Sequence, residues 1–269
     1  MTDTDNPRAI VAERAATAGA ELAVEQFRTG IAAETKGSVT DIVTEADRAA
    51  QRRVIEVIGE TFPGETIVGE EEDVLKTVPD EGAVWIIDPI DGTNNFVDGI
   101  RVWGTAVAAV VDGEPVAAAV VLPALEDSYT ADRTAAYRNG TEISVSETSE
   151  PALSTVAPML WWDTDSRGAY AAATREIVQR FDDLRRFGSA QATLALIADG
   201  SIEGGITDLQ AHPWDSVAGV HLVRQAGGTV TDVDGERWRH DSTGMVISNG
   251  AVHEAVQAAT DGIVDRAGD

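Results

Sequence analysis

The spacing of hydrophobic positions in the first half of the chain predicts two helices followed by a sheet. Apolar residues recur at helical spacing over residues 7–29 and again over 45–59. Asp112-Gly113 and Asn139-Gly140 each lie between apolar or alternating segments, which is the pattern of a β-hairpin. Further strands are predicted for the apolar runs "ETIV" and "AVWIID". We therefore expect two helices beside a mostly antiparallel sheet.

The pattern changes at about residue 154, where predicted strands and helices begin to alternate. The predicted helices are "SAQATLALIADG", "DSVAGVHLVRQAGG", residues 168–181 and residues 251–264. The predicted strands are "STVAPML", "LRRF", "EGGIT", "TVTDV" and "MVIS". Such alternation favours a layered α/β arrangement. The chain is thus an α+β protein, which we divide into an N-terminal subdomain, 1–150, and a C-terminal subdomain, 151–269.

Composition adds a strong negative charge to this picture. The 269 residues include 46 acidic and 20 basic side chains, for a net charge of −26, and the only lysines are Lys36 and Lys76. The acids are spread along the chain, as in proteins of cells that keep molar salt inside; at about 1 M salt the Debye length is only ~3 Å. We therefore predict a halophilic protein that binds neither nucleic acid nor anionic membranes. A small phosphorylated substrate requires cations at its site.

The sequence lacks the features needed for disulfides, membrane spans and secretion. It contains no cysteine, so neither disulfides nor thiol chemistry is expected. No apolar run reaches the ~18–20 residues that span a bilayer, and "MTDTDNPRAI" has none of the features of a signal peptide. We therefore expect a cytoplasmic protein.

The candidate chemistry begins with two acids at the end of a predicted core strand, in "WIIDPIDGTNNF". Pro89 cannot donate a hydrogen bond to a neighbouring strand, so we expect the strand to break after Asp88. Gly92 permits a tight turn into a short helix, and Asp91 could simply cap that helix. Capping explains one acid but not the second.

Two further segments place acids beside predicted core elements. "IVGEEE" ends a strand with residues 70–72, and "HPWDSVAG" places Asp215 at the start of an apolar helix. Taken separately, the first is typical of a solvated loop and the second of a helix N-cap. The sequence spacing alone does not bring these segments together.

Taken together, the motifs resemble the inositol monophosphatase family of magnesium-dependent, lithium-sensitive phosphatases. "DPIDGTNNF" and "WDSVAGVHLVRQAGG" are similar to the two family signatures, and "KGSVTDIVTEAD" and "IVGEE" match the pattern upstream. The similarity covers roughly residues 7–260. It implies a layered α-β-α-β-α sandwich of the inositol monophosphatase/fructose-1,6-bisphosphatase type, with the active site between two halves and a homodimer as the usual assembly.

The resemblance also implies roles for individual residues. One metal would be held by Glu70, Asp88 and the carbonyl of Ile90, and a second by Asp88, Asp91 and Asp215. Asp47 and Glu70 would border a weaker third position. The catalytic residues would be Glu70, Thr93 and Asp47, and the phosphate would bind to the amides of Gly92 and Thr93. The substrate ring would contact Asp91, Ala190 and Asp208, and Lys36 would lie in a loop near the metals.

Electrostatics supports a metal centre independently. Two unit charges 4 Å apart interact by about 4 kcal/mol at an effective dielectric of ~20, so converging carboxylates need protons or cations among them. Oxygen ligands favour Mg²⁺, and we expect two or three ions per site. One ion would activate water for in-line attack on phosphorus, and another would stabilise the departing oxygen. No nucleophile motif predicts a phosphoenzyme.

The predicted activity is hydrolysis of a small phosphorylated polyol or sugar, and inositol 1-phosphate is the favoured substrate. Fructose 1,6-bisphosphatase activity is the main alternative, and its second phosphate would need a cation such as Arg167, Arg185 or Arg186. A 3′-phosphoadenosine 5′-phosphate phosphatase is a weaker alternative. A non-catalytic metal- or phosphate-binding relative is disfavoured because Glu70 and Thr93 are both present.

Overall fold

A seven-stranded sheet forms the larger β layer of the computed structural model, which describes residues 7–30, 33–35, 42–72, 74–160 and 165–267. All neighbouring strands are antiparallel except β3 and β4, which are parallel. In spatial order the strands are β3 (Thr66–Gly69), β4 (Ala83–Asp91), β5 (Gly104–Val111), β6 (Glu114–Leu122), β7 (Asp127–Ala131), β8 (Ala136–Arg138) and β9 (Thr141–Ile143).

Both predicted hairpins are confirmed. Asp112 and Gly113 join β5 to β6 with φ angles of 51° and 77°, and Asn139 and Gly140 join β8 to β9 with φ angles of 51° and 76°. Positive φ at both central positions is the two-residue turn that matches the twist of the flanking strands. The Asp-Gly and Asn-Gly pairs therefore close these two hairpins, and the pairing of β5 with β6 shifts once in register between Ala109 and Val110.

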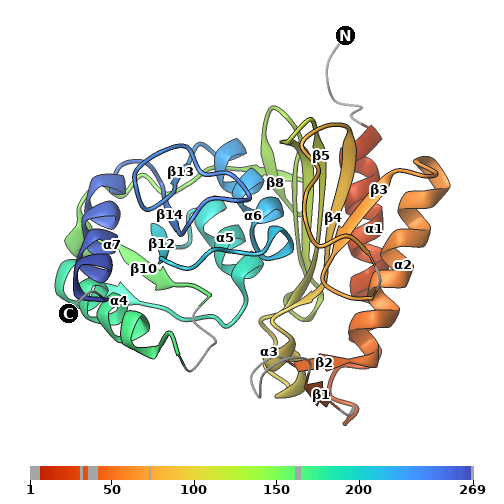
Figure 1. Cartoon of the computed structure of the whole chain (residues 1–269), viewed down its shortest axis with the longest axis horizontal. Helices are drawn as coiled ribbons and strands as arrows, with labels where there is room; N and C mark the ends of the chain where they lie inside the picture. Colours follow the sequence, from red (N-terminus) through yellow and green to blue (C-terminus); the bar gives the residue numbers. More distant parts are fainter. Residues whose placement is uncertain (1–6, 31–32, 36–41, 73, 161–164, 268–269) are drawn as a thin grey trace.

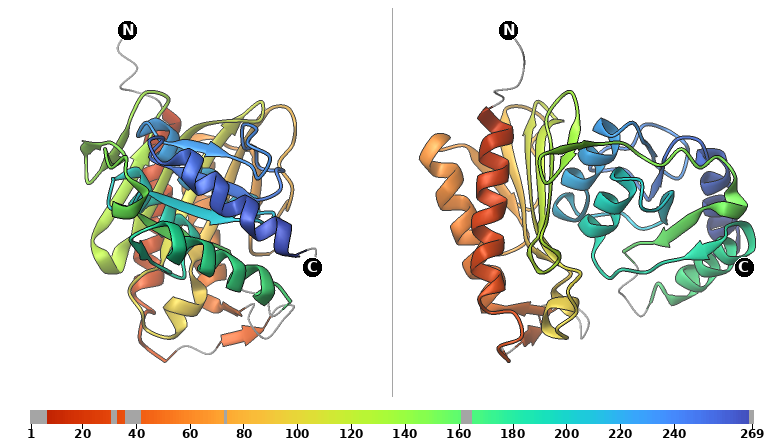
Figure 2. Two further views of the ribbon diagram at one scale, coloured as in Figure 1. Left: turned by 90° about the vertical axis from the view of Figure 1, so that its left-hand side faces the viewer. Right: turned by 180° about the vertical axis from the view of Figure 1, so that it is seen from behind.

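Helices α1 (Pro7–Val24) and α2 (Glu45–Thr61) cover the outer face of the large sheet (Figures 1 and 2). Their small apolar side chains pack against Trp85 and Ile87 of β4, among others. The approach is close at Gly19, where a Cβ atom would lie 2.7 Å from Val54 Cγ2. The remaining elements on this side are β1 (Ala33–Thr35), β2 (Ile42–Thr44) and α3 (Thr93–Val97).

Helix α1 ends earlier than the residue 29 predicted from its apolar spacing. The chain beyond Val24 forms turns, and Arg28 adopts a φ of 62°. The Arg28 guanidinium donates hydrogen bonds of 2.9 and 2.6 Å to the carbonyl of Gly99, while Phe27 packs against Phe96 and Trp103. These tertiary contacts replace the last helical turns, which the periodicity alone does not reveal.

A five-stranded sheet forms the second β layer, in the order β11 (Asp183–Leu184), β10 (Thr155–Pro158), β12 (Gly204–Thr207), β14 (Met245–Ser248) and β13 (Thr229–Thr231). It is mixed: β10 is parallel to β11 and β12, whereas β14 is antiparallel to both of its neighbours. Of the predicted strand "LRRF", only Leu184 lies in β11. Short 3₁₀ helices are η1 (Pro123–Leu125) and η2 (Pro151–Leu153).

Helices α5 (Ala190–Ala198) and α6 (Pro213–Gln225) lie between the two sheets and share one apolar core with both (Figure 1). Helices α4 (Arg167–Arg180) and α7 (His253–Ala267) cover the outer face of the smaller sheet. The layers are therefore α-β-α-β-α, as the sequence predicted. No helix among the described residues has both the length and the apolar character needed to cross a membrane.

Candidate metal centre

A β-bulge in β4 turns Asp88 and Asp91 toward the same side of the sheet. Asp88 pairs with Ala106 and Asp91 with Gly104, so Pro89 and Ile90 together oppose the single residue Thr105. Side chains alternate along a strand, and residues three apart would otherwise point to opposite faces. The strand therefore continues through Asp91 and does not break after Asp88 as expected.

The bulge is held by a side-chain hydrogen bond. Thr105 Oγ1 donates to the carbonyl of Pro89 at 2.7 Å, and Thr105 is fully buried. Pro89 has no N–H to donate, which suits it to a position outside the regular ladder. The sequence thus contained the local signal for a bulge, but the signal was interpreted as the end of the strand.

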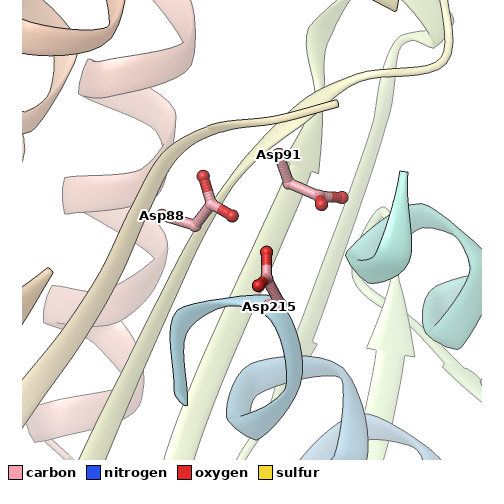
Figure 3. A group of neighbouring side chains, drawn as sticks. All are labelled: Asp88, Asp91 and Asp215. Carbon is pink, nitrogen blue, oxygen red and sulfur yellow. The ribbon is translucent and has the colours of Figure 1, made fainter. Parts of the chain in front are cut away.

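Asp215 approaches these two acids from the first turn of α6. The helix begins at Pro213 with His212 as its N-cap residue, so the interpretation of Asp215 as the N-cap is wrong. The carboxylates of Asp88, Asp91 and Asp215 each offer an oxygen, and these oxygens all lie within 4.8 Å of one another (Figure 3). Two distant segments of the chain therefore form one group of three aspartates.

Asp88 is the most constrained member of this group. It is 1% exposed, and its Oδ1 has no hydrogen-bond partner among the described residues. Burial, followed by the charges of Glu70, Asp91, Asp215 and Asp47, raises the pKa of Asp88 well above its usual value. A buried carboxylate oxygen without a donor among other carboxylates needs a proton or a cation.

Asp91 connects the two halves of the molecule. Its carboxylate accepts hydrogen bonds from the Ser189 hydroxyl and from the backbone N–H groups of Ala190 and Gln191, the latter two at 3.0 and 2.8 Å. Burial raises the pKa of Asp91, and these donors oppose the shift. Asp91 does not cap α3, whose N-cap is Gly92; it instead accepts bonds at the N-terminus of α5.

Asp47 and Thr93 lie next to the end of β4. Thr93 Oγ1 is 3.2 Å from Asp47 Oδ1 and 3.0 Å from the carbonyl oxygen of Ile90. The other oxygen of Asp47 accepts 2.7 and 2.6 Å bonds from the backbone N–H and the hydroxyl of Thr44, which closes a capping box on α2. The pairing of Thr93 with Asp47 is therefore present, and both side chains are fixed.

The acidic loop after β3 is anchored rather than freely solvated. Glu71 is 4% exposed, and its backbone N–H and carbonyl bond to the side-chain amide of Gln51 at 2.9 and 2.5 Å. Glu72 pairs with Arg52 at 2.5 Å. Glu70, which precedes them, is half-buried and is close enough to raise the pKa of Asp88, but it lies outside the described group of three aspartates.

The remaining predicted residues occupy varied positions. Gly92 has a φ of 89°, and a Cβ atom there would lie 3.1 Å from both the carbonyl oxygen of Gly188 and Ser189 Cβ, so glycine is required. The N–H of Ala190, predicted to face a substrate, donates to Asp91. Asp208 follows β12 and is half-buried, outside the aspartate group. Lys36 lies outside the described residues.

Several residues that support the site were not predicted. Ser189 is the N-cap of α5, and its position before an apolar helix was an available signal. Gln191 Nε2 donates to the carbonyl of Trp214 at 2.5 Å, which ties α5 to the residue preceding Asp215. Lys76 Nζ lies within 3.3 Å of the carbonyl oxygens of residues 69–72. The exposed His212 stacks on Trp214, with 4.8 Å between ring centroids.

The donor set fits a hard divalent cation. The three aspartates supply only carboxylate oxygens, and the backbone carbonyl of Ile90, which Thr93 contacts, lies in the same strand end. Oxygen ligands of this kind suit Mg²⁺, which binds through few carboxylates and retains waters. The orphaned Oδ1 of Asp88 is the atom that most needs such an ion. The residues present therefore fit a magnesium centre.

Similarity to known proteins covers nearly the whole chain. Residues 5–264 match the inositol monophosphatase family. The chain is 35% identical over 240 residues to a fructose-1,6-bisphosphatase/inositol-1-monophosphatase of Thermotoga maritima, covering 87% of this chain and 88% of that protein. It is 32% identical over 241 residues to an inositol-1-monophosphatase of Bacillus subtilis, covering 89% and 90%. The solved Thermotoga maritima IMPase aligns with a TM-score of 0.86 at 30% identity, over 98% of this chain and 99% of that one.

Proposed function

Because the chain belongs to the inositol monophosphatase family, we propose that it hydrolyses inositol 1-phosphate to inositol and phosphate with Mg²⁺. Members of the family are phosphatases, so phosphomonoester hydrolysis follows from membership, whereas the substrate is our proposal. The observation that carries the assignment to this chain is the convergence of three aspartates within 4.8 Å of one another, one of which has a buried oxygen with no donor in the described part of the chain.

We assign the metal ligands as follows: Asp88, Asp91 and Asp215 for one ion, and Glu70, Asp88 and the Ile90 carbonyl for a second. Bound Mg²⁺ would supply a water of lowered pKa and neutralise charge on the phosphoryl oxygens. Asp88 belongs to both sets because it is the central acid, perturbed by each of the others. Asp47 and Glu70 would border a third position.

The chain's own groups would orient the reaction. The Thr93 hydroxyl, held between Asp47 and the Ile90 carbonyl, is in a position to align the attacking water. The amides of Gly92 and Thr93 would bind the phosphate, and Gly92 permits this because its left-handed backbone leaves no side chain in the way. Asp91, Ala190 and Asp208 are proposed to contact the alcohol part of the substrate. Lys36 keeps its proposed place in a loop near the metals.

Fructose 1,6-bisphosphate is the second candidate substrate. The Thermotoga maritima relative carries both activities in its name, which makes the pair worth separating in this chain. A second phosphate needs a cation: Arg186 stacks over the ring of Tyr170, with its guanidinium carbon 5.3 Å from the ring centroid, and Arg185 pairs with Asp183. Two of the three candidate arginines therefore contact other groups, and on this ground we favour the monophosphate.

A hydrolysis panel tests the substrate. Inositol 1-phosphate, fructose 1,6-bisphosphate and 3′-phosphoadenosine 5′-phosphate should be compared by kcat/KM with Mg²⁺ at high KCl. We expect inositol 1-phosphate to give the highest value. A higher value for fructose 1,6-bisphosphate would replace the proposed substrate. Metal binding without phosphate release from any of the three would identify a non-catalytic relative.

Asp88→Asn tests the metal centre itself. The variant keeps the shape of the side chain but removes the charge shared by both proposed metal sites, so we expect kcat/KM to fall at least about a thousandfold, or ~4 kcal/mol. In EDTA, the variant should unfold at no lower urea concentration than the parent, because a buried acid has been removed. Asp98→Asn, an exposed control with the same charge change, should keep its turnover. Near-normal turnover in Asp88→Asn would remove Asp88 from the centre.

A further inference from the structure

A pocket bordered by basic side chains lies toward the end of β4 that is opposite to Asp91. It opens to solvent and lies between β4, the β5–β6 turn, α6 and the segment after β13. The register of β4 with β5 places the Asp112-Gly113 turn beside Ala83, at the far end of the strand from Asp91. The basic residues that line it are Arg224, Arg237, Arg239 and His240.

The positive groups here are poorly neutralised by the protein. Arg237 pairs with Glu114 at 2.7 Å. The Arg224 guanidinium instead donates to the carbonyls of Trp238 and Val230, at 2.7 and 3.5 Å. Within the part of the chain that the structure describes, no carboxylate lies within 4.0 Å of the Arg224 or Arg239 guanidinium. In a chain with 46 acidic and 20 basic residues, such a gathering of cations is unexpected.

The shortage of neutralising anions coincides with partial burial of one of the cations, Arg224. Burial, and next the charge of Arg237, lowers the pKa of Arg224 to about 10, so the group stays cationic at neutral pH in an environment that disfavours its charge. Trp238, which also lines the pocket, is 2% exposed, and its indole N–H has no acceptor among the described residues. A buried donor without an acceptor is costly, and the charge of the half-buried Arg224 is offset only in part by Glu114, which pairs with Arg237. Both deficits occur in one pocket.

We propose that this pocket binds a small tetrahedral oxyanion of the phosphate type. Guanidinium groups donate paired hydrogen bonds that match phosphate oxygens, and arginine is the residue most suited to this recognition. Such an anion would neutralise Arg224 and Arg239 and bring acceptors to the wall formed by Trp238. The site is distinct from the metal centre because none of the three aspartates lines the pocket, although Ile86 and Val217 of its wall are each two residues from one of them.

The test is calorimetric titration of inorganic phosphate into the full chain in excess EDTA, at fixed ionic strength and neutral pH. EDTA removes the metal on which phosphate binding at the aspartates would depend. We expect one phosphate to bind, and Arg239→Gln to weaken it at least about tenfold through loss of a charge-assisted bond. Arg239 is exposed, so the substitution should leave folding intact. Arg175→Gln, an exposed arginine on α4 with the same charge change, is the control and should bind like the parent.

Two outcomes would overturn the proposal: no phosphate binding in EDTA, or equal binding by the parent and Arg239→Gln. Repeating the titration with Asp88→Asn separates this site from the metal centre, because that variant should bind phosphate like the parent in EDTA. Arg239→Gln should in turn retain its turnover. Failure of the proposed phosphatase activity would therefore leave the phosphate titration unaffected, and the reverse also holds.

Discussion

At the scale of single residues, burial disfavours the charged form of several ionisable side chains. Asp88 is the extreme case in the metal centre, where cations can compensate. His221 is another, on the buried side of α6 far from the aspartates. It is 3% exposed, and its Nε2 has no partner among the described residues. No anion neighbours it closely enough to offset its burial, so it must remain neutral when the protein is folded.

His221 predicts a loss of stability in acid. Burial lowers the pKa of His221 to about 4 from the usual 6.5. The unfolded chain therefore binds a proton between these values and the folded one does not, so stability is complete above pH 6.5 and falls as the pH drops toward 4. At pH 4.5 the contribution of His221 to this loss should be about 2–3 kcal/mol relative to pH 7.5. Urea unfolding at the two pH values measures it.

His221→Gln provides the comparison because it cannot titrate in this range. Its loss of stability between pH 7.5 and 4.5 should be smaller than that of the parent by the same about 2–3 kcal/mol. If parent and His221→Gln lose stability equally, His221 is protonated in the folded protein.

At the scale of elements, the sequence predicted the helices and hairpins well but not their junctions. The hairpin turns were local signals in two residues, and the structure confirms both. The bulge in β4 was not predicted, because Pro89 is compatible with either a strand end or an irregular ladder. The start of α6 at Pro213 was missed for a similar reason: proline in the first turn begins a helix as readily as it ends one.

The site could be predicted only as a set of separate segments. Matching motifs indicated the acids, but their convergence depends on α5 and α6 packing between two sheets, which no local pattern encodes. The supporting contacts of Ser189, Gln191 and Lys76 join residues far apart in the sequence. Lys76 gave no signal at all, since a loop lysine usually remains in solvent.

The contacts of Lys76 lead us to predict that this residue holds the loop that contains Glu70. Its ammonium group contacts four carbonyls of residues 69–72 and lies 5.8 Å from the centroid of the Trp214 ring, next to Asp215. Lys76→Met keeps the aliphatic stem but loses these contacts. If the proposed metal ligands are right, calorimetric Mg²⁺ affinity should fall about tenfold, in the range for residues that orient metal ligands.

Arg53→Met, which removes an exposed cation from α2, is the matched control and should leave Mg²⁺ affinity unchanged. Lys76→Met should also raise the Mg²⁺ concentration for half-maximal activity more than it lowers kcat. Unchanged Mg²⁺ affinity in Lys76→Met would show that the loop is positioned without the ammonium group.

The hydrogen bonds of Ser189 let us predict how much the connection between β4 and α5 contributes to the free energy of unfolding. Its hydroxyl accepts a 3.1 Å bond from the N–H of Ala192 as N-cap and donates to Asp91. Ser189→Ala removes the cap, worth about 1 kcal/mol, and one donor to a buried carboxylate, worth about 1–2 kcal/mol more. Urea unfolding in EDTA should therefore show a loss of about 2–3 kcal/mol. Ser201→Ala, at an exposed position, should change stability by less than ~0.5 kcal/mol. A similarly small change in Ser189→Ala would mean that Asp91 finds other donors.

At the scale of the whole molecule, the two halves meet through specific polar contacts. Besides the bonds from α5 to Asp91, the side-chain amide of Asn95 donates to the carbonyls of Val102 and Phe187, at 2.6 and 2.8 Å. These bonds join α3 to the turn before α5, beside the metal centre. The division near residue 150 and the homodimer both stay predictions, which limited proteolysis and sedimentation would test.

The net charge of −26 predicts that salt stabilises the fold. Unfolding separates the excess acids, so their mutual repulsion favours the unfolded chain. Raising KCl shortens the Debye length from about 10 Å at 0.1 M to about 3 Å at 1 M. Salt also weakens exposed ion pairs such as Arg52 with Glu45, but these contribute only about 0–1 kcal/mol each. Relief of repulsion should therefore dominate.

We expect Tm at pH 7 to rise by at least about 5 °C between 0.1 M and 1 M KCl, which corresponds to roughly 2 kcal/mol for a domain of this size. The same comparison near the isoelectric point of about 4.3 separates charge screening from general effects of salt on apolar burial. There the acids and bases balance, so the gain should largely disappear because little net repulsion remains to be screened. An equal gain at both pH values would assign the stabilisation to apolar burial and not to the acidic surface.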